Sequence, residues 1–161
     1  MPKIDLKKLA KFLVKAKRNT YASGSEENIK SQRPDFKELE FKEGNWIYRD
    51  SYSGFFRAPG QEIVRFNGKP IWNMSYDGGM LPEFFGDVDF AIQTFKFLIK
   101  AMKMINESKP FRGPPNLKDG NWEYKMKLEG NIKNFRGTEK ILFKRKIVFA
   151  QNFMGGLILD K

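Results

Sequence analysis

Two segments of the chain place apolar residues at the three- and four-residue spacing of an amphipathic helix. The apolar face of the first consists of Leu6, Leu9, Phe12, Leu13 and Ala16, and that of the second consists of Ala91, Phe95, Leu98, Met102 and Ile105. Asp87 or Asp89 is suitably placed to cap the start of the second helix. The lysines between the apolar positions are typical of a solvated helix face. The alternative is a basic helix that lies on anionic lipid or DNA.

After each helix the hydrophobic period shortens to two residues, which indicates β-strands. The clearest case is Trp122–Leu128, and the matching segment in the first half is Trp46–Tyr52. Turn signals at 43–45 and 119–121 place a short strand before each of these, over Lys37–Lys42 in the first half. A second hairpin is expected in each half, formed by Glu62–Phe66 with Ile71–Tyr76 and by Lys140–Phe143 with Ile147–Phe153. Each half is thus expected to be a helix followed by three or four antiparallel strands.

Three blocks of sequence recur in the same order in the two halves, which indicates an internal duplication. Phe12–Ala16 resembles Phe97–Ala101, Lys42–Tyr48 resembles Lys118–Tyr124, and Glu62–Leu81 aligns without gaps on Glu139–Ile158. One copy has too small an interior to fold alone, so we expect an α+β fold in which two units pack about a pseudo-twofold axis, with the helices outside the sheet or sheets.

Residues 1–161 are then expected to form a single domain of two repeats, at about 1–81 and 82–161. Two segments interrupt the symmetry. Residues 20–34 are rich in Ser, Gly, Glu and Asn, and residues 110–115 are rich in Pro and Gly. Both are expected to be loops, and either is placed to cover a cleft.

The composition excludes several classes of chemistry. The chain has no Cys and no His, so disulfides, thiolate nucleophiles, zinc–cysteine sites and histidine-based catalysis are ruled out. The net charge of +11 raises nucleic acid as a partner. The excess is spread over both halves, however, and the longest basic block is Lys144–Lys146. A solvated surface is therefore favoured.

Membrane association is not expected. The apolar runs are far shorter than the roughly 18 residues of a membrane span. Lysines interrupt the apolar segment near the N-terminus, so a cleaved secretory signal is not expected either. The sequence favours a cytoplasmic protein.

Differences between the two copies point to a candidate site. Asp50 and Tyr52 stand where the second copy has methionine and leucine, and Asp77 stands where it has Met154. A carboxylate on the dry face of a strand needs a partner or water, because burying it unpaired is costly. We therefore predict a ligand-binding cavity lined by Trp46, Tyr48, Asp50, Tyr52, Trp72 and Tyr76, with Arg33, Arg57 or Arg112 beside it. The alternative is that the tyrosines reach solvent, that Asp50 pairs with a neighbouring cation and that the other aromatic residues are core.

Signals for other chemistry are weak. Asp50 with Glu62 or Asp77 is the available carboxylate pair, but nothing in the sequence sets their separation, so no catalytic residue is assigned. No metal or cofactor is expected. The double glycines at 78–79 and 155–156 lack a phosphate-loop pattern and are interpreted as strand-ending turns. Features shared by both copies, such as Glu62 and Glu139, are interpreted as what each unit needs to fold.

Several short blocks together form a recognisable pattern. They are Thr20-Tyr21-Ala22, Arg33-Pro34, Tyr48-x-Asp50-x-Tyr52-x-Gly54, Trp72-x-Met74-x-Tyr76-x-Gly78, Phe111-Arg112-Gly113-Pro114 and Gly155-Gly156. In these blocks the chain resembles a prokaryotic domain family of unknown function, whose members occur alone or behind an Xre-type helix-turn-helix. This chain has no such DNA-reading element. The resemblance implies an effector-sensing module and assigns no activity.

The function expected from the sequence is the binding of a small molecule without chemistry, as a sensor or regulatory module. Two alternatives remain. A nucleic-acid-binding protein would use a basic, aromatic sheet face, and its affinity would fall steeply with salt. A carboxylate-dependent enzyme would bring two acidic side chains together in a cleft. The sequence leaves open the identity of the ligand, the oligomeric state, and whether the strands form one sheet or two.

Overall fold

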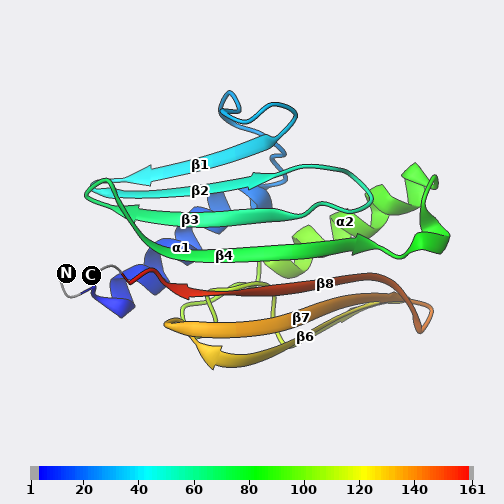
Figure 1. The fold of residues 1–161 in the computed structure, drawn as a ribbon. Helices are drawn as coiled ribbons and strands as arrows, with labels where there is room; N and C mark the ends of the chain where they lie inside the picture. Colours follow the sequence, from blue (N-terminus) through cyan, green and yellow to red (C-terminus); the bar gives the residue numbers. More distant parts are fainter. Residues whose placement is uncertain (1–3, 160–161) are drawn as a thin grey trace.

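The computed structural model describes residues 4–159, which form two α-helices and eight β-strands (Figure 1). The helices are α1 (Leu6–Asn19) and α2 (Val88–Met102), and the short 3₁₀ turns are η1 (Tyr21–Ser23) and η2 (Pro82–Phe84). The strands are β1 (Lys37–Glu43), β2 (Trp46–Tyr52), β3 (Gly60–Phe66), β4 (Lys69–Met80), β5 (Asn116–Asp119), β6 (Trp122–Asn131), β7 (Asn134–Phe143) and β8 (Lys146–Leu157). The side chain of Asp87 accepts the N–H of Phe90, so Asp87 is the cap of α2.

All eight strands form one antiparallel sheet in the order β1-β2-β3-β4-β8-β7-β6-β5. Each half contributes four sequential strands, and the halves meet where β4 pairs with β8, with Tyr76 opposite Phe153. The order of elements is the same in both halves, a helix followed by four strands. The fold is therefore α+β, and the strands form a single sheet instead of two facing sheets.

Both helices cover the same face of the sheet, which we call the inner face (Figure 1). Leu13 of α1 and Leu98 of α2 join Trp72 and Ile141 of the sheet in one hydrophobic core. Side chains alternate along each strand, and the pairing register places the aromatic side chains of all the named strands on this inner face. The helices therefore lie together on one side of the sheet, and neither covers the outer face.

The double glycines lie inside β4 and β8, so their interpretation as strand-ending turns is wrong. Residues 53–59, which join β2 to β3, run against β4 at this point. Met80 N donates to Phe56 O at 2.7 Å, and Ala58 N donates to Gly78 O at 3.0 Å. A Cβ atom on Gly79 would lie 2.0 Å from Phe56 O, and Gly79 has a φ of 150°. Glycine is required there because two backbones approach closely.

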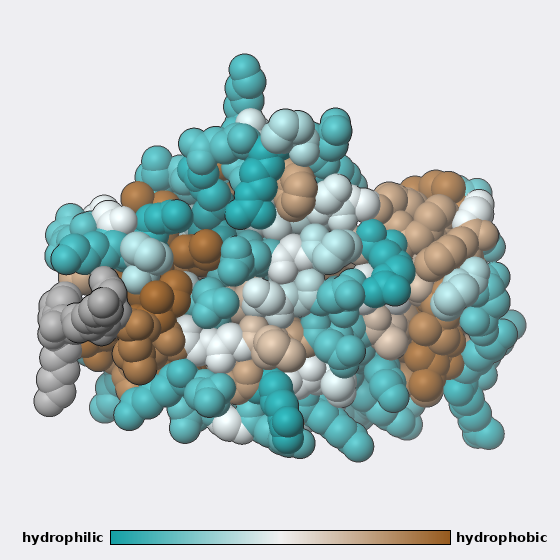
Figure 2. Space-filling view, viewed as in Figure 1, coloured by the Kyte–Doolittle hydropathy of each residue, from teal (hydrophilic) through white to brown (hydrophobic). Residues whose placement is uncertain are grey.

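The surface seen in Figure 2 is polar over most of its area, with hydrophobic side chains gathered towards its two ends. At one end lie the segment that joins β4 to α2, where Phe85 is exposed, and the first turns of α2, where Val88 and Ile92 are exposed. Neither helix among residues 4–159 combines the length and the hydrophobicity needed to cross a membrane.

Candidate functional site

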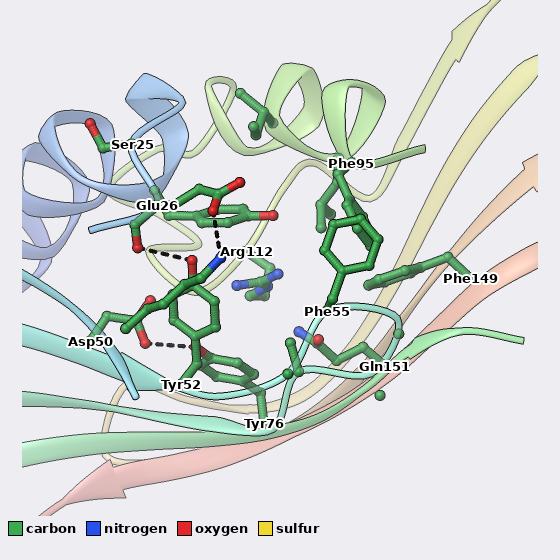
Figure 3. A pocket seen from close by; sticks show the side chains of 18 of the residues that line it. Ser25, Glu26, Asp50, Tyr52, Phe55, Tyr76, Phe95, Arg112, Phe149 and Gln151 are labelled. Carbon is green, nitrogen blue, oxygen red and sulfur yellow. Dashed lines mark hydrogen bonds and ion pairs between the residues drawn. The ribbon is translucent and has the colours of Figure 1, made fainter. Parts of the chain in front are cut away.

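A partly open cavity of about 130 Å³ lies between the inner face of the sheet, α2 and the segment after α1 (Figure 3). Its walls differ in character. The polar side is formed by Asp50, Tyr52, Tyr76, Arg112 and Gln151, and the apolar side by Phe55, Phe95, Leu98 and Phe149. A cavity with an apolar wall and a few converging polar groups is typical of small-molecule sites.

Asp50 is the central acidic group of this cavity. It lies on the inner face of β2 opposite Glu62 of β3, and it is only 4% exposed. The hydroxyl of Tyr76 donates to its Oδ1 at 2.7 Å. Burial and the negative charge of Glu62 raise the pKa of Asp50 to about 7. The Asp50 carboxyl group therefore changes between its protonated and ionised forms near neutral pH.

Lys17 and Glu62 form a buried ion pair beneath the cavity. The Lys17 Nζ and Glu62 Oε2 atoms are 2.5 Å apart, and both side chains are almost fully buried. Lys17 Nζ also donates to Phe111 O at 2.6 Å, which ties the segment 110–115 to α1. Burial lowers the pKa of Lys17, while the negative charge of Glu62 opposes that change. Lys17 offsets only part of the effect of Glu62 on Asp50, because the negative charge of Glu62 raises the pKa of Asp50 more than the positive charge of Lys17 lowers it.

Arg112 and Glu139 form a second buried pair. The Arg112 Nε and Nη2 atoms donate to Glu139 Oε1 at 3.0 and 2.6 Å. Tyr124 and Gln151 also donate to this carboxylate, at 2.6 and 3.0 Å. Burial opposes the charge of Arg112, but Glu139 beside it raises the pKa of the guanidinium above its usual value. Gly113 N donates to the Tyr124 hydroxyl, so this network also fixes the loop that carries Arg112.

Glu62 and Glu139, which match in the alignment of the two halves, are thus both buried beside a cation from their own half. Asp50 has no such partner. No Lys or Arg nitrogen of residues 4–159 lies within ion-pair distance of its carboxylate. The position that matches Asp50 in the second half holds Met126, an apolar core residue.

The structure brings four of the nine candidate site residues together. Asp50, Tyr52, Tyr76 and Arg112 line the cavity. The Tyr52 hydroxyl donates to Glu26 O at 2.9 Å, which holds the segment 20–34 against the cavity. Both loops that were expected to cover a cleft, residues 20–34 and 110–115, contribute residues to its wall.

Trp46, Tyr48 and Trp72 do not line the cavity, which corrects that part of the prediction. The ring of Trp46 packs against Phe12, and those of Tyr48 and Trp72 are buried in the core. Strand geometry gives the reason. The side chains of residues 46 and 52 share a face of β2 but are separated by about 20 Å along the strand, so one small cavity cannot reach both.

Arg33 and Arg57 also lie outside the predicted arrangement. Arg33 is exposed and stacks over the ring of Phe36, 5.3 Å from its centre. Arg57 pairs with Asp77 at the surface, with 2.8 Å between Arg57 Nη2 and Asp77 Oδ1. Asp77 and its counterpart Met154 are both about 60% exposed, so this difference between the halves falls on the outer face. The prediction that position 77 and its counterpart lie on the dry face of the sheet is therefore wrong.

Several residues of the cavity and of the layer beneath it were missed by the sequence analysis. Lys17 follows Leu13 by four residues and so lies within the apolar stripe of α1, which is a readable signal for a buried lysine. Gln151 of the second half matches Met74 of the first half. It is therefore a polar residue at a position where the other copy is apolar, which is the same signal that pointed to Asp50. Phe55 and Phe95 carry no signal that separates them from other core phenylalanines.

The remaining chemical options have less support. No group of three or more acidic side chains suited to a metal ion occurs among residues 4–159. The outer face carries Lys125, Lys127 and Lys140, but the aromatic residues of the named strands lie on the inner face. Stacking of nucleic-acid bases on that basic face therefore has no platform on these strands.

Comparison with protein families matches residues 50–158 to a domain of unknown function, DUF5680. The chain belongs to this family. The matched range begins at Asp50 and includes Tyr76, Arg112 and Gln151, whereas α1 and the loop 20–34 precede it. No curated protein and no solved structure shows significant similarity to the chain.

Proposed function

We propose that the protein binds a small molecule in the cavity between α2 and the sheet, without chemical conversion, and acts as a sensor or regulatory module. The observation that carries this proposal is the position of Asp50. It is a buried carboxylate without a cationic partner, and it faces a partly open cavity that has an aromatic wall.

The energetics of Asp50 favour a functional role over a structural one. A buried carboxylate without an ion-pair partner destabilises a fold unless it is protonated or neutralised. We also propose that the two halves are copies of one unit, as their shared order of elements suggests. The second copy builds the matching position with Met126, so the architecture does not need an acid there. Strained or destabilised groups of this kind concentrate at binding sites.

The size of the cavity limits the part of the ligand that is buried. A dry cavity of roughly 150 Å³ in another protein holds one benzene molecule. The present cavity, of about 130 Å³, therefore suits a single ring or a short branched chain with one polar end. A larger ligand would extend through the opening beside Glu26 and Lys37, whose side chains pair at 2.5 Å.

The regulatory part of the proposal rests on the family resemblance. Relatives that carry an Xre-type helix-turn-helix would use the same module to sense an effector in the cytoplasm. In this chain the module would report ligand occupancy to a partner that the geometry of the cavity does not identify.

A thermal-shift screen of small metabolites tests the proposal. A ligand at a hundred times its Kd stabilises the native state by about 2.7 kcal/mol, which for a chain of this size raises Tm by roughly 5–10 °C. Hits that occupy the cavity will lose affinity in Asp50→Asn and Tyr52→Phe. Asp77→Asn is the matched control, because it makes the same chemical change on the outer face. If both cavity variants keep the affinity of every hit, the site is wrongly assigned.

A further inference from the structure

The buried carboxylates of the described residues have a cation beside them except at one position. Glu62 is paired with Lys17 and Glu139 with Arg112, at ion-pair distances of 2.5 and 2.6 Å. Among the buried carboxylates of residues 4–159, Asp50 has no cation within 4 Å. Its Oδ1 accepts the Tyr76 hydroxyl, and no donor from the described residues reaches its Oδ2. The unmatched charge therefore faces the cavity with an acceptor to spare.

An anionic ligand would meet an unfavourable arrangement in this cavity. Arg112 is the buried cation in its wall, but two of its donors are already bound to Glu139 Oε1. Its guanidinium also stacks over the Tyr76 ring, 5.7 Å from the ring centre. A carboxylate ligand would either compete with Glu139 for the guanidinium or bind its remaining N–H groups close to the negative charge of Asp50. Either outcome disfavours it, because like charges repel strongly away from water.

A cationic ligand meets the opposite conditions. Asp50 offers it an opposite charge at a position that is only 4% exposed, and charge-assisted hydrogen bonds are stronger than those between neutral groups. The rings of Tyr52 and Tyr76 lie on the same side of the cavity as Asp50 (Figure 3). Lys37 and Arg112 already lie over these rings, 5.9 and 5.7 Å from the ring centres, so the attraction for a ligand cation comes from Asp50 itself. Phe55 and Phe95 form the opposite wall, with ring centres 5.4 Å apart, and provide a surface for an apolar group.

We propose that the cavity selects small organic amines, in which a protonated amino group pairs with Asp50 and an apolar, ring-sized group packs against Phe55 and Phe95. This inference rests on the proposed function and adds the chemical class of the ligand. It involves no covalent step. The amino group supplies the cation that the fold supplies to Glu62 and Glu139 but not to Asp50.

Three probes of equal size and different charge test this inference, namely benzylamine, benzyl alcohol and benzoate. Binding is measured by calorimetry and by the shift of backbone amide resonances in the wild-type protein. Because a hydrogen bond to a charged group contributes roughly 1.5–3 kcal/mol, benzylamine is expected to bind about ten to a hundred times more tightly than benzyl alcohol. Benzoate is expected to bind more weakly than either.

The variant Asp50→Asn removes the charge and keeps an acceptor for the Tyr76 hydroxyl. In this variant benzylamine and benzyl alcohol are expected to bind equally well, whereas Asp77→Asn retains the full preference for the amine. The wild-type series alone decides the question if Asp50→Asn does not fold.

The affinity for an amine and the affinity for a neutral ligand are expected to change with pH in different directions. Asp50 has a pKa of about 7 and must ionise to pair with a cation. The affinity for benzylamine therefore rises roughly tenfold from pH 6 to pH 8, while that for benzyl alcohol stays level or falls. The charged or titratable groups that face Asp50 are Lys17 from α1, Tyr21 from η1, Tyr48 and Tyr52 from β2, Glu62 from β3, Tyr76 from β4 and Arg112 from the loop 110–115. The chain has no His, so no histidine side chain titrates between pH 6 and pH 8.

The outcomes distinguish two failures. If benzyl alcohol or benzoate binds as tightly as benzylamine, or if Asp50→Asn keeps the preference for the amine, the inference about amines is wrong and the binding function stands. If neither the three probes nor the metabolite screen gives a ligand that shifts resonances of the cavity residues, the proposed function fails as well.

Discussion

Replacing Asp50 with asparagine is expected to stabilise the protein, and to do so more strongly as the pH rises. Asp50 is 4% exposed, and its folded-state pKa is about 7 against an ordinary value of 3.8. Because the folded state holds this proton more tightly than the unfolded chain, the stability contributed by Asp50 falls as the pH rises from about 4 to about 7 and then levels off. At pH 8 the buried carboxylate costs about 4 kcal/mol relative to its protonated form.

The asparagine variant isolates this contribution. It retains the acceptor for the Tyr76 hydroxyl but has no proton to lose. At pH 5 only part of the cost is present, so the free energy of unfolding of Asp50→Asn relative to wild type should increase by about 2–3 kcal/mol between pH 5 and pH 8. Comparing the two proteins at each pH removes the contributions of all other titrating groups, provided that they are the same in both.

Urea titrations at several pH values measure this difference directly. Asp77→Asn is the control, since Asp77 is 61% exposed and paired with Arg57, and its effect on stability should not grow over the same range. If the advantage of Asp50→Asn is constant between pH 5 and pH 8, the carboxylate is solvated or paired in solution. The argument for an unmatched buried charge would then be refuted.

Two further predictions concern the buried ion pair beneath the cavity and the glycine at which the loop 53–59 packs on β4. Lys17→Met leaves Glu62 buried without a cation and should lower the free energy of unfolding by about 3–5 kcal/mol in urea titrations, whereas Lys17→Met/Glu62→Leu should recover most of that loss. An equal loss in the single and double variants would show that the pair does not act as one. Gly79→Ala would place a Cβ atom 2.0 Å from Phe56 O and should lower Tm strongly, while Gly86→Ala, also at a positive φ but with no atom within 4 Å, should lower it less, by the backbone strain alone. Equal Tm values for the two variants would contradict the close packing of residues 53–59 on β4.

The local elements followed from patterns that act over a few residues. Alternation over Trp46–Tyr52 predicted β2 with the bounds that the structure shows, and the turn signal at 43–45 placed β1 before it. The apolar stripe from Leu6 to Ala16 predicted α1. The double glycines failed as turn signals because backbone from elsewhere in the chain approaches them closely, the loop 53–59 at Gly79 and Asn73 of β4 at Gly155.

The candidate site could be predicted only in part, because it too depends on contacts between segments that are far apart in the chain. The substitution of Asp50 for an apolar residue marked a buried polar position, and Tyr52 belongs to the same cavity. Arg112 was one of three arginines proposed, and nothing local separated it from Arg33. Its selection depends on Glu139, which lies 27 residues further along the chain and reaches the guanidinium only through the pairing of β7 with β8 and β6.

The sequence alone determined where the two helices and most of the strands form, which side of β2 and β6 is dry, and that an acid occupies one dry position in the first half. These properties depend on residues that are close together in the sequence, so the spacing of apolar and polar positions predicts them. Only the tertiary structure decided that the strands form one sheet, that both helices lie on the same face, and that Lys17 and Arg112 are bound to Glu62 and Glu139 and so leave Asp50 unpaired. Ion pairing in the interior depends on distances between segments far apart in the chain, and no local pattern specifies those distances.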